Sequence, residues 1–204
     1  MQLTVTTFLS VDGVYQGPGG PNEDRSGGFD RGGWVVPLFD EATGAFIDEV
    51  FGKVDAFLLG RRTYEIFAAS WPNSTDPNDA VAKKLNTLPK YVVSRTLGSA
   101  EWANSTIIDG DVVAEVTRLK AQPGNELQVH GSGMLVQSLL QHDLVDELRL
   151  IVFPVIVGAG RRLFPESGVA TGLQLTESRT TGSGAAIHVY RPIGRPEFGN
   201  LEVE

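Results

Sequence analysis

The order in which strand-like and helix-like segments alternate along the chain constrains the fold more than any other feature. Apolar and β-branched runs typical of strands lie at residues 3–9, 56–59, 90–94, 105–108, 127–130 and 147–154. Amphipathic runs typical of helices lie between most of them, at residues 39–51, 62–69, 80–88, 111–121 and 134–142. This order predicts an α/β fold with three layers (α/β/α), in which helices cover both faces of a mostly parallel sheet.

The end of the chain departs from this alternation. Residues 173–180 and 185–190 alternate apolar and polar side chains, and Gly182-Ser183-Gly184 connects them, which predicts an antiparallel C-terminal hairpin. The 204 residues include 41% apolar and 21% charged side chains, which suits one globular domain, and no repeat or linker divides them. We therefore expect a single domain over residues 1–193 and a loosely ordered tail over residues 194–204.

Glycine is unusually frequent and falls in clusters. Eight of the 24 glycines lie between Gly13 and Gly33, in a long stretch rich in Gly, Pro and charge that has no regular period. A long loop inside a compact domain is usually functional, and glycine suits backbone that turns sharply or lies close to a ligand. A flexible loop without such a role is the alternative interpretation. A second, polar loop is expected at residues 71–79.

Residue content excludes several kinds of chemistry. The chain has no cysteine, so disulfides, thiolate metal sites and a cysteine nucleophile are excluded. The three histidines, His130, His142 and His188, are far apart and form no zinc-hydrolase or deaminase pattern, so we expect no metal. The net charge of −8 argues against nucleic acid as a partner. Without a signal-like N-terminus or an apolar run long enough to span a membrane, we expect a cytoplasmic protein with a small-molecule partner.

Two predicted strands end in glycine directly before a predicted helix. At Gly60-Arg61-Arg62-Thr63, the N–H groups of a helix start and two guanidinium groups suit an anion such as phosphate. At Gly131-Ser132-Gly133-Met134-Leu135, glycine would let a pyrophosphate lie against backbone N–H groups. The structural alternatives are solvated arginines with Thr63 as a helix cap at the first junction, and a plain tight turn at the second. The pattern G-x-G-x-x-G is incomplete there, because residue 136 is valine.

Two further strand ends carry small or basic residues. Ser94-Arg95-Thr96 lies at the end of the strand at 90–94, and Gly158-Ala159-Gly160 follows the strand at 147–154. Ligands of open α/β sheets bind at the carboxyl ends of the strands, so the four junctions together indicate a site better than any one of them. His130 ends the strand at 127–130, and we interpret it as a residue of the core or of a pocket wall rather than as a catalytic base.

Short segments of this chain match, in order and spacing, those of a known superfamily. They are Ser10-Val11-Asp12-Gly13, residues 59–65 (LGRRTYE), residues 90–97 (KYVVSRTL), Gly131-Ser132-Gly133, and residues 144–148 (LVDEL) with the Pro, Gly and Leu-Phe positions that follow. Through them the chain resembles the dihydrofolate-reductase-like superfamily. It is most similar to the reductase domain of the riboflavin-biosynthesis deaminase–reductase and its stand-alone relatives. The resemblance covers most of residues 1–191 and implies a dihydrofolate-reductase-like fold.

This resemblance implies NADPH as the cofactor and hydride transfer to a small heterocyclic substrate, such as a ribosylated pyrimidine or a pterin-like ring. The glycine-rich loop after Asp12 would lie over the nicotinamide and the substrate. Two arginines near a 2′-phosphate favour NADPH over NADH. The adenosine-phosphate side of the cofactor would lie against Gly60, Arg61, Arg62, Thr63, Ser94, Arg95 and Thr96, and its pyrophosphate against Gly131, Ser132, Gly133, Met134 and Leu135.

The resemblance fails at the catalytic carboxylate. Dihydrofolate reductases carry one on the helix after the mobile loop, and Asp40, Glu41, Asp48 and Glu49 here do not fall at the expected spacing from Gly60. In the riboflavin branch the aspartate of the Ser-x-Asp-Gly turn lies close to the site, which makes Asp12 the candidate acid or substrate anchor. A turn-forming aspartate is its structural alternative. No deaminase-type zinc ligands are present, so a deaminase step is not expected.

These expectations leave three functions to compare. The first is a stand-alone NADPH-dependent reductase. The second is a non-catalytic nucleotide-binding or regulatory module on the same fold, which the missing carboxylate suggests. The third is a reductase with a flavin-type cofactor in the same groove. A homodimer is expected in each case, because the hairpin at residues 173–190 would leave a sheet edge that needs covering, and relatives of the family are often dimeric.

Overall fold

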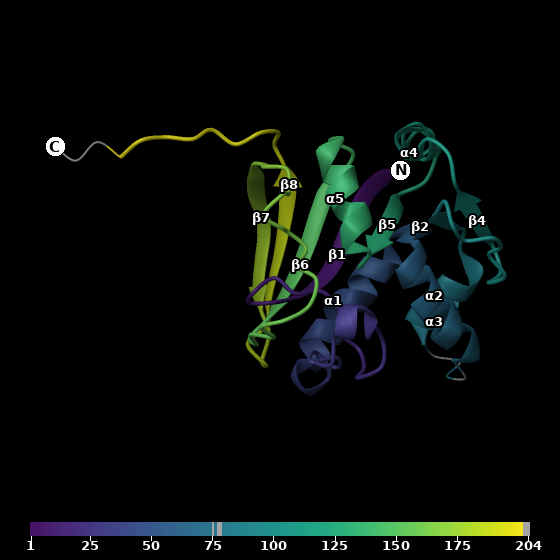
Figure 1. The fold of residues 1–204 in the computed structure, drawn as a ribbon, viewed down its shortest axis with the longest axis horizontal. Helices are drawn as coiled ribbons and strands as arrows, with labels where there is room; N and C mark the ends of the chain where they lie inside the picture. Colours follow the sequence, from purple (N-terminus) through teal and green to yellow (C-terminus); the bar gives the residue numbers. More distant parts are fainter. Residues whose placement is uncertain (75, 77–78, 202–204) are drawn as a thin grey trace.

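A single sheet forms the centre of the computed structural model, which describes residues 1–74, 76 and 79–201. Its eight strands are ordered β4-β3-β2-β5-β1-β6-β8-β7 (Figure 1). β1 to β6 pair in parallel, whereas β8 is antiparallel to both β6 and β7. This confirms the predicted mostly parallel sheet with an antiparallel C-terminal hairpin. The strands are β1 Gln2–Ser10, β2 Val54–Gly60, β3 Lys90–Val93, β4 Ser105–Ile108, β5 Glu126–His130, β6 Glu147–Phe153, β7 Leu173–Thr180 and β8 Ala186–Pro192.

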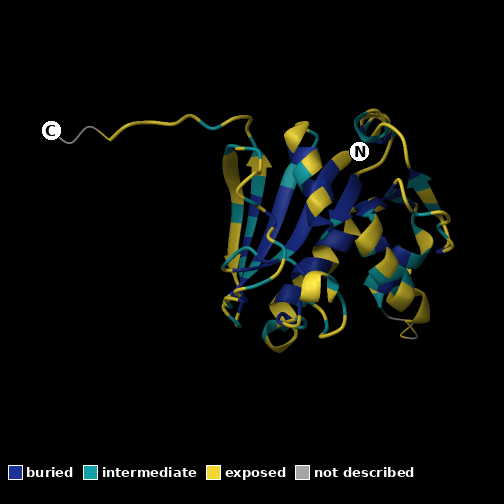
Figure 2. Ribbon diagram, viewed as in Figure 1, coloured by how far each residue is buried: buried dark blue, intermediate teal, exposed yellow. Residues whose placement is uncertain are grey.

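Helices cover both faces of this sheet, as predicted. One apolar cluster holds side chains of α1 (Glu41–Gly52), α2 (Arg61–Ser70) and α3 (Ala80–Thr87), and the opposite cluster holds those of α4 (Val112–Lys120) and α5 (Gly133–Gln141). Figure 2 shows the buried strands between the partly exposed helices. In β2, Phe57 and Leu59 enter the first cluster, while Ala56 and Leu58 enter the second. A central strand buried on both faces explains why its sequence is a continuous apolar run rather than an alternating one.

The first helix begins two residues later than the sequence pattern predicts. Asp40 adopts extended backbone, and its Oδ1 accepts hydrogen bonds from the N–H and the hydroxyl of Thr43 at 2.9 and 2.7 Å. This N-cap starts the helix at Glu41, so Phe39, expected on the helical face, lies outside the helix. The apolar period of this segment was predicted correctly, and only its start was displaced by the cap.

The glycine-rich segment is a packed loop rather than a flexible one. Trp34 donates from Nε1 to the carbonyl of Gln16 at 2.9 Å, and Gln16 donates from Nε2 to the carbonyls of Asp24 and Ser26 at 3.2 and 3.0 Å. The side chains of Phe29, Trp34 and Val35 are buried. These bonds and buried rings hold the loop against the carboxyl edge of the sheet. Short 3-10 turns occur at Ser26–Gly28, Val36–Leu38 and Trp71–Asn73.

The C-terminal segment leaves the sheet after β8 and extends away from it (Figure 1). Phe198 and Leu201 are almost fully exposed there. A loosely ordered tail stays a prediction, and its residues 202–204 lie outside the described ranges, as do residues 75, 77 and 78 of the loop predicted at 71–79. Within the described ranges, none of the helices has the length and apolar character needed to cross a membrane.

Candidate ligand-binding cavity

A cavity of about 740 Å³ lies at the carboxyl edge of the parallel strands. Its wall combines the ends of β2 and β5 and the starts of α2 and α5 with the first part of the glycine-rich loop. This is the edge where open α/β sheets bind ligands, and the volume falls in the range of small-molecule and cofactor sites. Nine of the predicted cofactor-binding residues line it: Gly60, Arg61, Arg62, Thr63, Gly131, Ser132, Gly133, Met134 and Leu135.

Two helices that begin at the cavity, α2 and α5, lack the side-chain caps found on α1, α3 and α4, although the first residue of α4, Val112, also lines the cavity. α1, α3 and α4 follow Asp40, Asp79 and Asp111, and each carboxylate accepts a hydrogen bond from an N–H of the first turn. α2 follows Gly60 and α5 follows Ser132, and among the described residues no side chain caps either start. Because uncapped N–H groups and the helix dipole both favour negative charge, these two helix starts have the chemistry that suits an anion.

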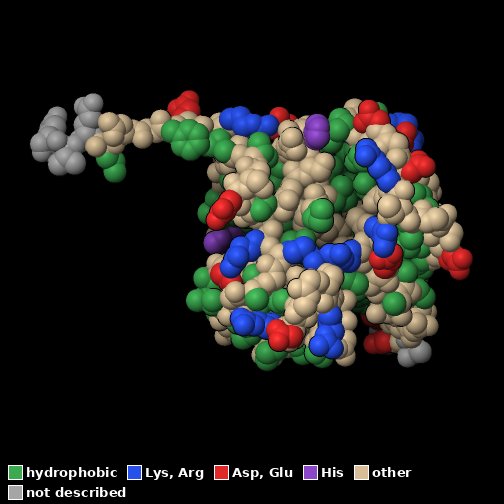
Figure 3. Space-filling view, in the orientation of Figure 1, with side chains coloured by type: hydrophobic (Ala, Val, Ile, Leu, Met, Phe, Trp, Pro, Cys, Tyr) green, Lys and Arg blue, Asp and Glu red, His purple; other side chains and the backbone are tan. Residues whose placement is uncertain are grey.

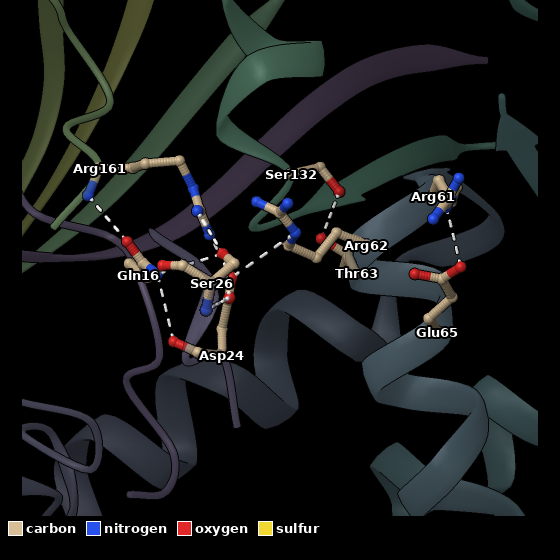
Figure 4. A network of polar contacts seen from close by, with 9 residues as sticks. All are labelled: Gln16, Asp24, Ser26, Arg61, Arg62, Thr63, Glu65, Ser132 and Arg161. Carbon is tan, nitrogen blue, oxygen red and sulfur yellow. Dashed lines mark hydrogen bonds and ion pairs between the residues drawn. The ribbon is translucent and has the colours of Figure 1, made fainter. Parts of the chain in front are cut away.

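Ser132 joins these two helix starts. Its Oγ accepts a hydrogen bond from the Gly60 N–H at 3.1 Å and donates to Thr63 Oγ1 at 2.9 Å (Figure 4). Ser132 has the left-handed φ of +53°, which is uncommon for a residue other than glycine and turns its side chain towards α2. The hydroxyl therefore fixes the junctions to each other instead of capping α5. Thr63 does not act as the helix cap proposed as its structural alternative.

The side chain of Tyr15 leaves no room for a side chain at position 133, so this residue must be glycine. A Cβ atom built on Gly133 would lie only 2.4 Å from Cε1 and Cζ of Tyr15. From the sequence, Gly133 is expected to let a pyrophosphate lie close to the backbone. In the structure the missing side chain makes room for Tyr15, which lies against the start of α5 and also lines the cavity.

Three arginines surround the cavity. Arg61 donates from Nε to Glu65 at 2.8 Å and from Nη1 to Thr96 at 2.6 Å. Arg62 is half exposed and lies 3.9 Å from the Asp24 carboxylate. Arg161, which was not among the predicted site residues, comes from the segment after β6 and binds Asp24 and Ser26 (Figure 4). Figure 3 shows Lys and Arg side chains in a row across this face. The lining also holds three carboxylates, Glu23, Asp24 and Glu65, so the charges balance there, in contrast to the net charge of −8 of the whole chain.

The predicted segment Ser94-Arg95-Thr96 lies beside the cavity rather than in its wall. Ser94 Oγ accepts hydrogen bonds from the N–H groups of Thr96 and Leu97 at 3.1 and 2.9 Å, which closes the turn after β3. Arg95 is exposed, and Thr96 reaches the site only through its bond to Arg61. The convergence of strand ends is therefore strongest for β2 and β5.

Asp12, the candidate catalytic acid, is used in a turn outside the cavity lining. Its carboxylate accepts hydrogen bonds from Ser10 Oγ at 2.7 Å and from the N–H groups of Val157 and Gly158 at 3.0 and 2.9 Å, and Arg162 lies 3.3 Å away. Burial alone would raise the pKa of Asp12, but these bonds outweigh it and lower the pKa to about 2. A carboxylate ionised at neutral pH is a poor proton donor, so the geometry fits the structural alternative of a turn-forming aspartate.

Two carboxylates that sequence reasoning did not single out do line the cavity. Glu23 and Asp24 lie in the glycine-rich loop, where no period or motif marks them. Burial raises the pKa of Glu23, although its carboxylate accepts hydrogen bonds from the N–H groups of Gly19 and Gly20. For Asp24 the effect of burial is outweighed by bonds to Ser26 and the nearby arginines, which lower its pKa. The cavity thus has one carboxyl group whose pKa is raised, Glu23, beside one whose pKa is lowered, Asp24.

His130 lies on the cavity wall, in agreement with its interpretation as a pocket-wall residue. The centroid of its ring is 5.8 Å from that of Phe8, 5.7 Å from that of Phe51 and 5.8 Å from that of Phe67. Burial among these rings lowers the pKa of His130 to about 4. The imidazole is therefore neutral at physiological pH.

The sheet, its closing hairpin and the cavity at its carboxyl edge define a dihydrofolate-reductase-like α/β protein. The same fold occurs in a Shewanella sp. PV-4 protein ascribed to riboflavin biosynthesis, with a TM-score of 0.71 at 22% identity, over 94% of this chain and 99% of that one. It also occurs in a pyrimidine reductase-like protein of Corynebacterium diphtheriae, with a TM-score of 0.63 at 13% identity, over 94% and 92% of the two chains.

Within this class, the chain belongs to the RibD C-terminal domain family, whose model matches residues 1–187. It is 29% identical to the uncharacterized protein YyaP of Bacillus subtilis over 191 residues, which cover 93% of this chain and 94% of YyaP. It is 27% identical to YwjB of the same organism, also uncharacterized, over 78% of this chain and 85% of YwjB. The resemblance inferred from the short segments is thereby confirmed at the level of the family.

Proposed function

We propose that this protein is a stand-alone reductase that binds NADPH and passes a hydride to a small heterocyclic substrate, such as a ribosylated pyrimidine or a pterin-like ring. The observation that carries the proposal is the pair of uncapped helix starts, α2 and α5, which face one cavity beside Arg61 and Arg62. Membership of the RibD C-terminal domain family and the likeness to a pyrimidine reductase-like fold support it.

The residues of the cavity fit a dinucleotide phosphate. The starts of α2 and α5 would hold the pyrophosphate, and Arg61 and Arg62, both half exposed, would hold the 2′-phosphate. Phe8, Phe67 and the neighbouring Trp71 offer an apolar wall for a flat ring. NADPH when bound supplies the hydride from its nicotinamide ring. The protein binds and orients the two ligands, and the glycine-rich loop excludes water.

Glu23 is the proposed proton donor in place of Asp12. Reduction of a C=N or C=O bond needs a proton as well as a hydride, and a carboxyl group with a raised pKa is a better donor of that proton than one with a lowered pKa. Burial raises the pKa of Glu23, which lines the cavity, whereas Asp12 is ionised and lies outside the lining. Glu23→Gln is expected to reduce kcat on any accepted substrate while NADPH binding persists. Equal kcat in Glu23→Gln and wild type would remove Glu23 from this role.

Thermal unfolding with a reporter dye tests cofactor binding directly. NADPH should raise the melting temperature more than NADH does, because only NADPH carries the extra phosphate that Arg61 and Arg62 would bind. Arg62→Ala should remove most of that difference. Arg118→Ala is a matched control, since Arg118 pairs with Glu115 on α4 away from the cavity. Absence of any shift at millimolar NADPH would overturn the proposal.

A non-catalytic nucleotide-binding module remains the second candidate, because the structure places Asp12 in a turn rather than at the cavity. NADPH binding without oxidation across a panel of pterins, pyrimidines and small carbonyl compounds would favour it. A flavin-type cofactor would instead give the purified protein a flavin absorption spectrum. The homodimer is also part of the proposal, with the exposed edge strand β7 as its contact.

A further inference from the structure

The side chain of His130 has a buried nitrogen without a partner. Nδ1 is shielded from solvent and makes no hydrogen bond to any part of the chain that the structure describes. Rings surround it, contributed by Phe8 of β1, Phe51 of α1 and Phe67 of α2. Buried polar groups nearly always have a partner, so an orphan on a cavity wall calls for an explanation.

The aromatic surroundings determine which nitrogen of His130 carries the proton. A neutral imidazole has one N–H group and one bare nitrogen. An N–H at Nδ1 would be a buried donor without an acceptor, and orphaned donors are rarer and more costly than orphaned acceptors. The proton therefore belongs on Nε2. Since Nδ1 is shielded while His130 lines the cavity, Nε2 is the nitrogen that the cavity can reach.

A second orphan belongs to a residue that lines the same cavity from the opposite face of the sheet. The hydroxyl of Thr7 is also buried, has no partner among the described residues, and belongs to a residue that lines the cavity. Thr7 and Phe8 are adjacent in β1, so their side chains leave opposite faces of the sheet, and Phe8 is the one beside His130. Two unsatisfied polar groups, one on each face of the sheet, therefore belong to residues that line one cavity, which indicates that the cavity is built for a ligand with polar atoms.

We propose that His130 is the substrate-recognition residue of this cavity, and that its Nε2–H donates a hydrogen bond to an acceptor atom of a planar heterocycle held beside Phe8 and Phe67. The acceptor is a ring carbonyl oxygen or an unprotonated ring nitrogen. This inference rests on the proposed reductase function for the substrate class and goes beyond it in naming the contact. A ring with an amino group at that position would place its own N–H donor against the Nε2–H donor of His130. Because neither group can accept, such a ring would bind weakly.

Nuclear magnetic resonance of ¹⁵N-labelled histidine tests the inference without any turnover. The chain has only three histidines, and the spectrum of His130→Gln identifies the signals of His130. We expect the neutral Nε2–H tautomer between about pH 5 and pH 8. Addition of pterin, uracil or 2-pyridone, each with a ring carbonyl, should shift the Nε2 signal. The Nδ1–H tautomer, or an Nε2 signal that none of the three compounds moves, would overturn the inference.

Binding by the variants separates this contact from a structural role of the ring. His130→Phe keeps an aromatic ring among its neighbours but removes the donor, and should weaken binding of the compound that moves the signal by about tenfold. His130→Gln keeps an N–H donor and should recover part of the loss. His142→Phe, at an exposed position after α5, is the matched control and should bind as the wild type does. Equal affinity in His130→Phe and wild type would overturn the inference.

The shift in melting temperature with NADPH distinguishes this inference from the proposed function. His130→Phe should retain the full shift, because the phosphate-binding helix starts are unchanged. If wild type shows no shift with NADPH while pterin still moves the Nε2 signal, the reductase proposal fails and the recognition role of His130 stands. If NADPH raises the melting temperature while none of the three compounds moves the Nε2 signal, the reductase proposal stands and the recognition role of His130 fails.

Discussion

The contact between Gly133 and Tyr15 predicts that Gly133→Ala destabilises both the fold and the cavity. The new methyl group would lie 2.4 Å from two atoms of the Tyr15 ring, whereas carbon atoms in contact are about 3.5–4.0 Å apart. The ring must therefore move by at least about 1 Å. Its backbone is held, because the Tyr15 N–H donates to the carbonyl of Arg161 at 3.0 Å. Overpacking of this kind costs about 1–3 kcal/mol of unfolding free energy.

Urea unfolding gives this loss directly, and Gly44→Ala is the matched control. Gly44 lies inside α1, and a Cβ there would meet only Phe39, at an ordinary 3.6 Å. Alanine at position 44 should therefore stabilise the protein by about 0.5–1 kcal/mol, because it restricts the unfolded chain. The opposite signs of the two substitutions separate a steric clash from a general response to a methyl group.

A double-mutant cycle with Tyr15→Ala assigns the cost to the ring. Once the ring is removed, Gly133→Ala should lose most of its effect, which gives a coupling energy of about 1 kcal/mol or more. The melting temperatures of the same variants can also be measured with and without NADPH. The increase caused by NADPH should be smaller in Gly133→Ala than in wild type, because Tyr15 lies at the start of α5. Wild-type stability of Gly133→Ala, or additive effects in the cycle, would refute the reasoning.

Three other predictions concern the buried Arg149–Glu126 pair, the buried His130 and the oligomeric state. Arg149→Ala should lower the free energy of unfolding in urea by about 3–5 kcal/mol, because it leaves the buried Glu126 carboxylate without its two 2.8 Å bonds. Unfolding free energy should fall by up to about 3 kcal/mol between pH 6.5 and pH 4, because the unfolded chain protonates His130 in this window and the folded chain does not. His130→Phe should flatten that dependence, and an unchanged slope would contradict it. Size-exclusion chromatography with light scattering should give the mass of a dimer, and a monomer at all concentrations would remove that proposal.

The fold was predictable because its signals are local. Strands buried on both faces have continuous apolar runs, helices have an amphipathic period, and the Gly182-Ser183-Gly184 turn sits between two alternating segments. Only element ends moved, as at Glu41, where the side chain of Asp40 overrides the apolar pattern. Periodicity reports which face of an element is buried, whereas caps decide where the element begins.

The candidate site was predictable only where it is also local. Gly60 to Thr63 and Gly131 to Leu135 are strand-to-helix junctions, and such junctions leave a mark in the sequence. Arg161 and Asp24 are 137 positions apart, and no pattern in either segment predicts that they form a pair. The contacts of Asp12 were not predictable for the same reason, because the N–H groups that hold its carboxylate come from the distant segment after β6.

The presence or absence of an N-terminal side-chain cap differs between the helices of this protein. Asp40 and Asp79 stand before helices whose first residues do not line the cavity, whereas Gly60 and Ser132 stand before two helices that begin at it. α4 is the exception, because it is capped by Asp111 although its first residue, Val112, lines the cavity. An N-terminal cap contributes about 1 kcal/mol to the free energy of unfolding. The two uncapped helices therefore lack this contribution in the protein without a ligand. A bound anion would satisfy the same N–H groups and return that free energy as affinity. The two uncapped starts therefore support the proposal that phosphate binds at this edge of the sheet, although the chain as a whole is acidic.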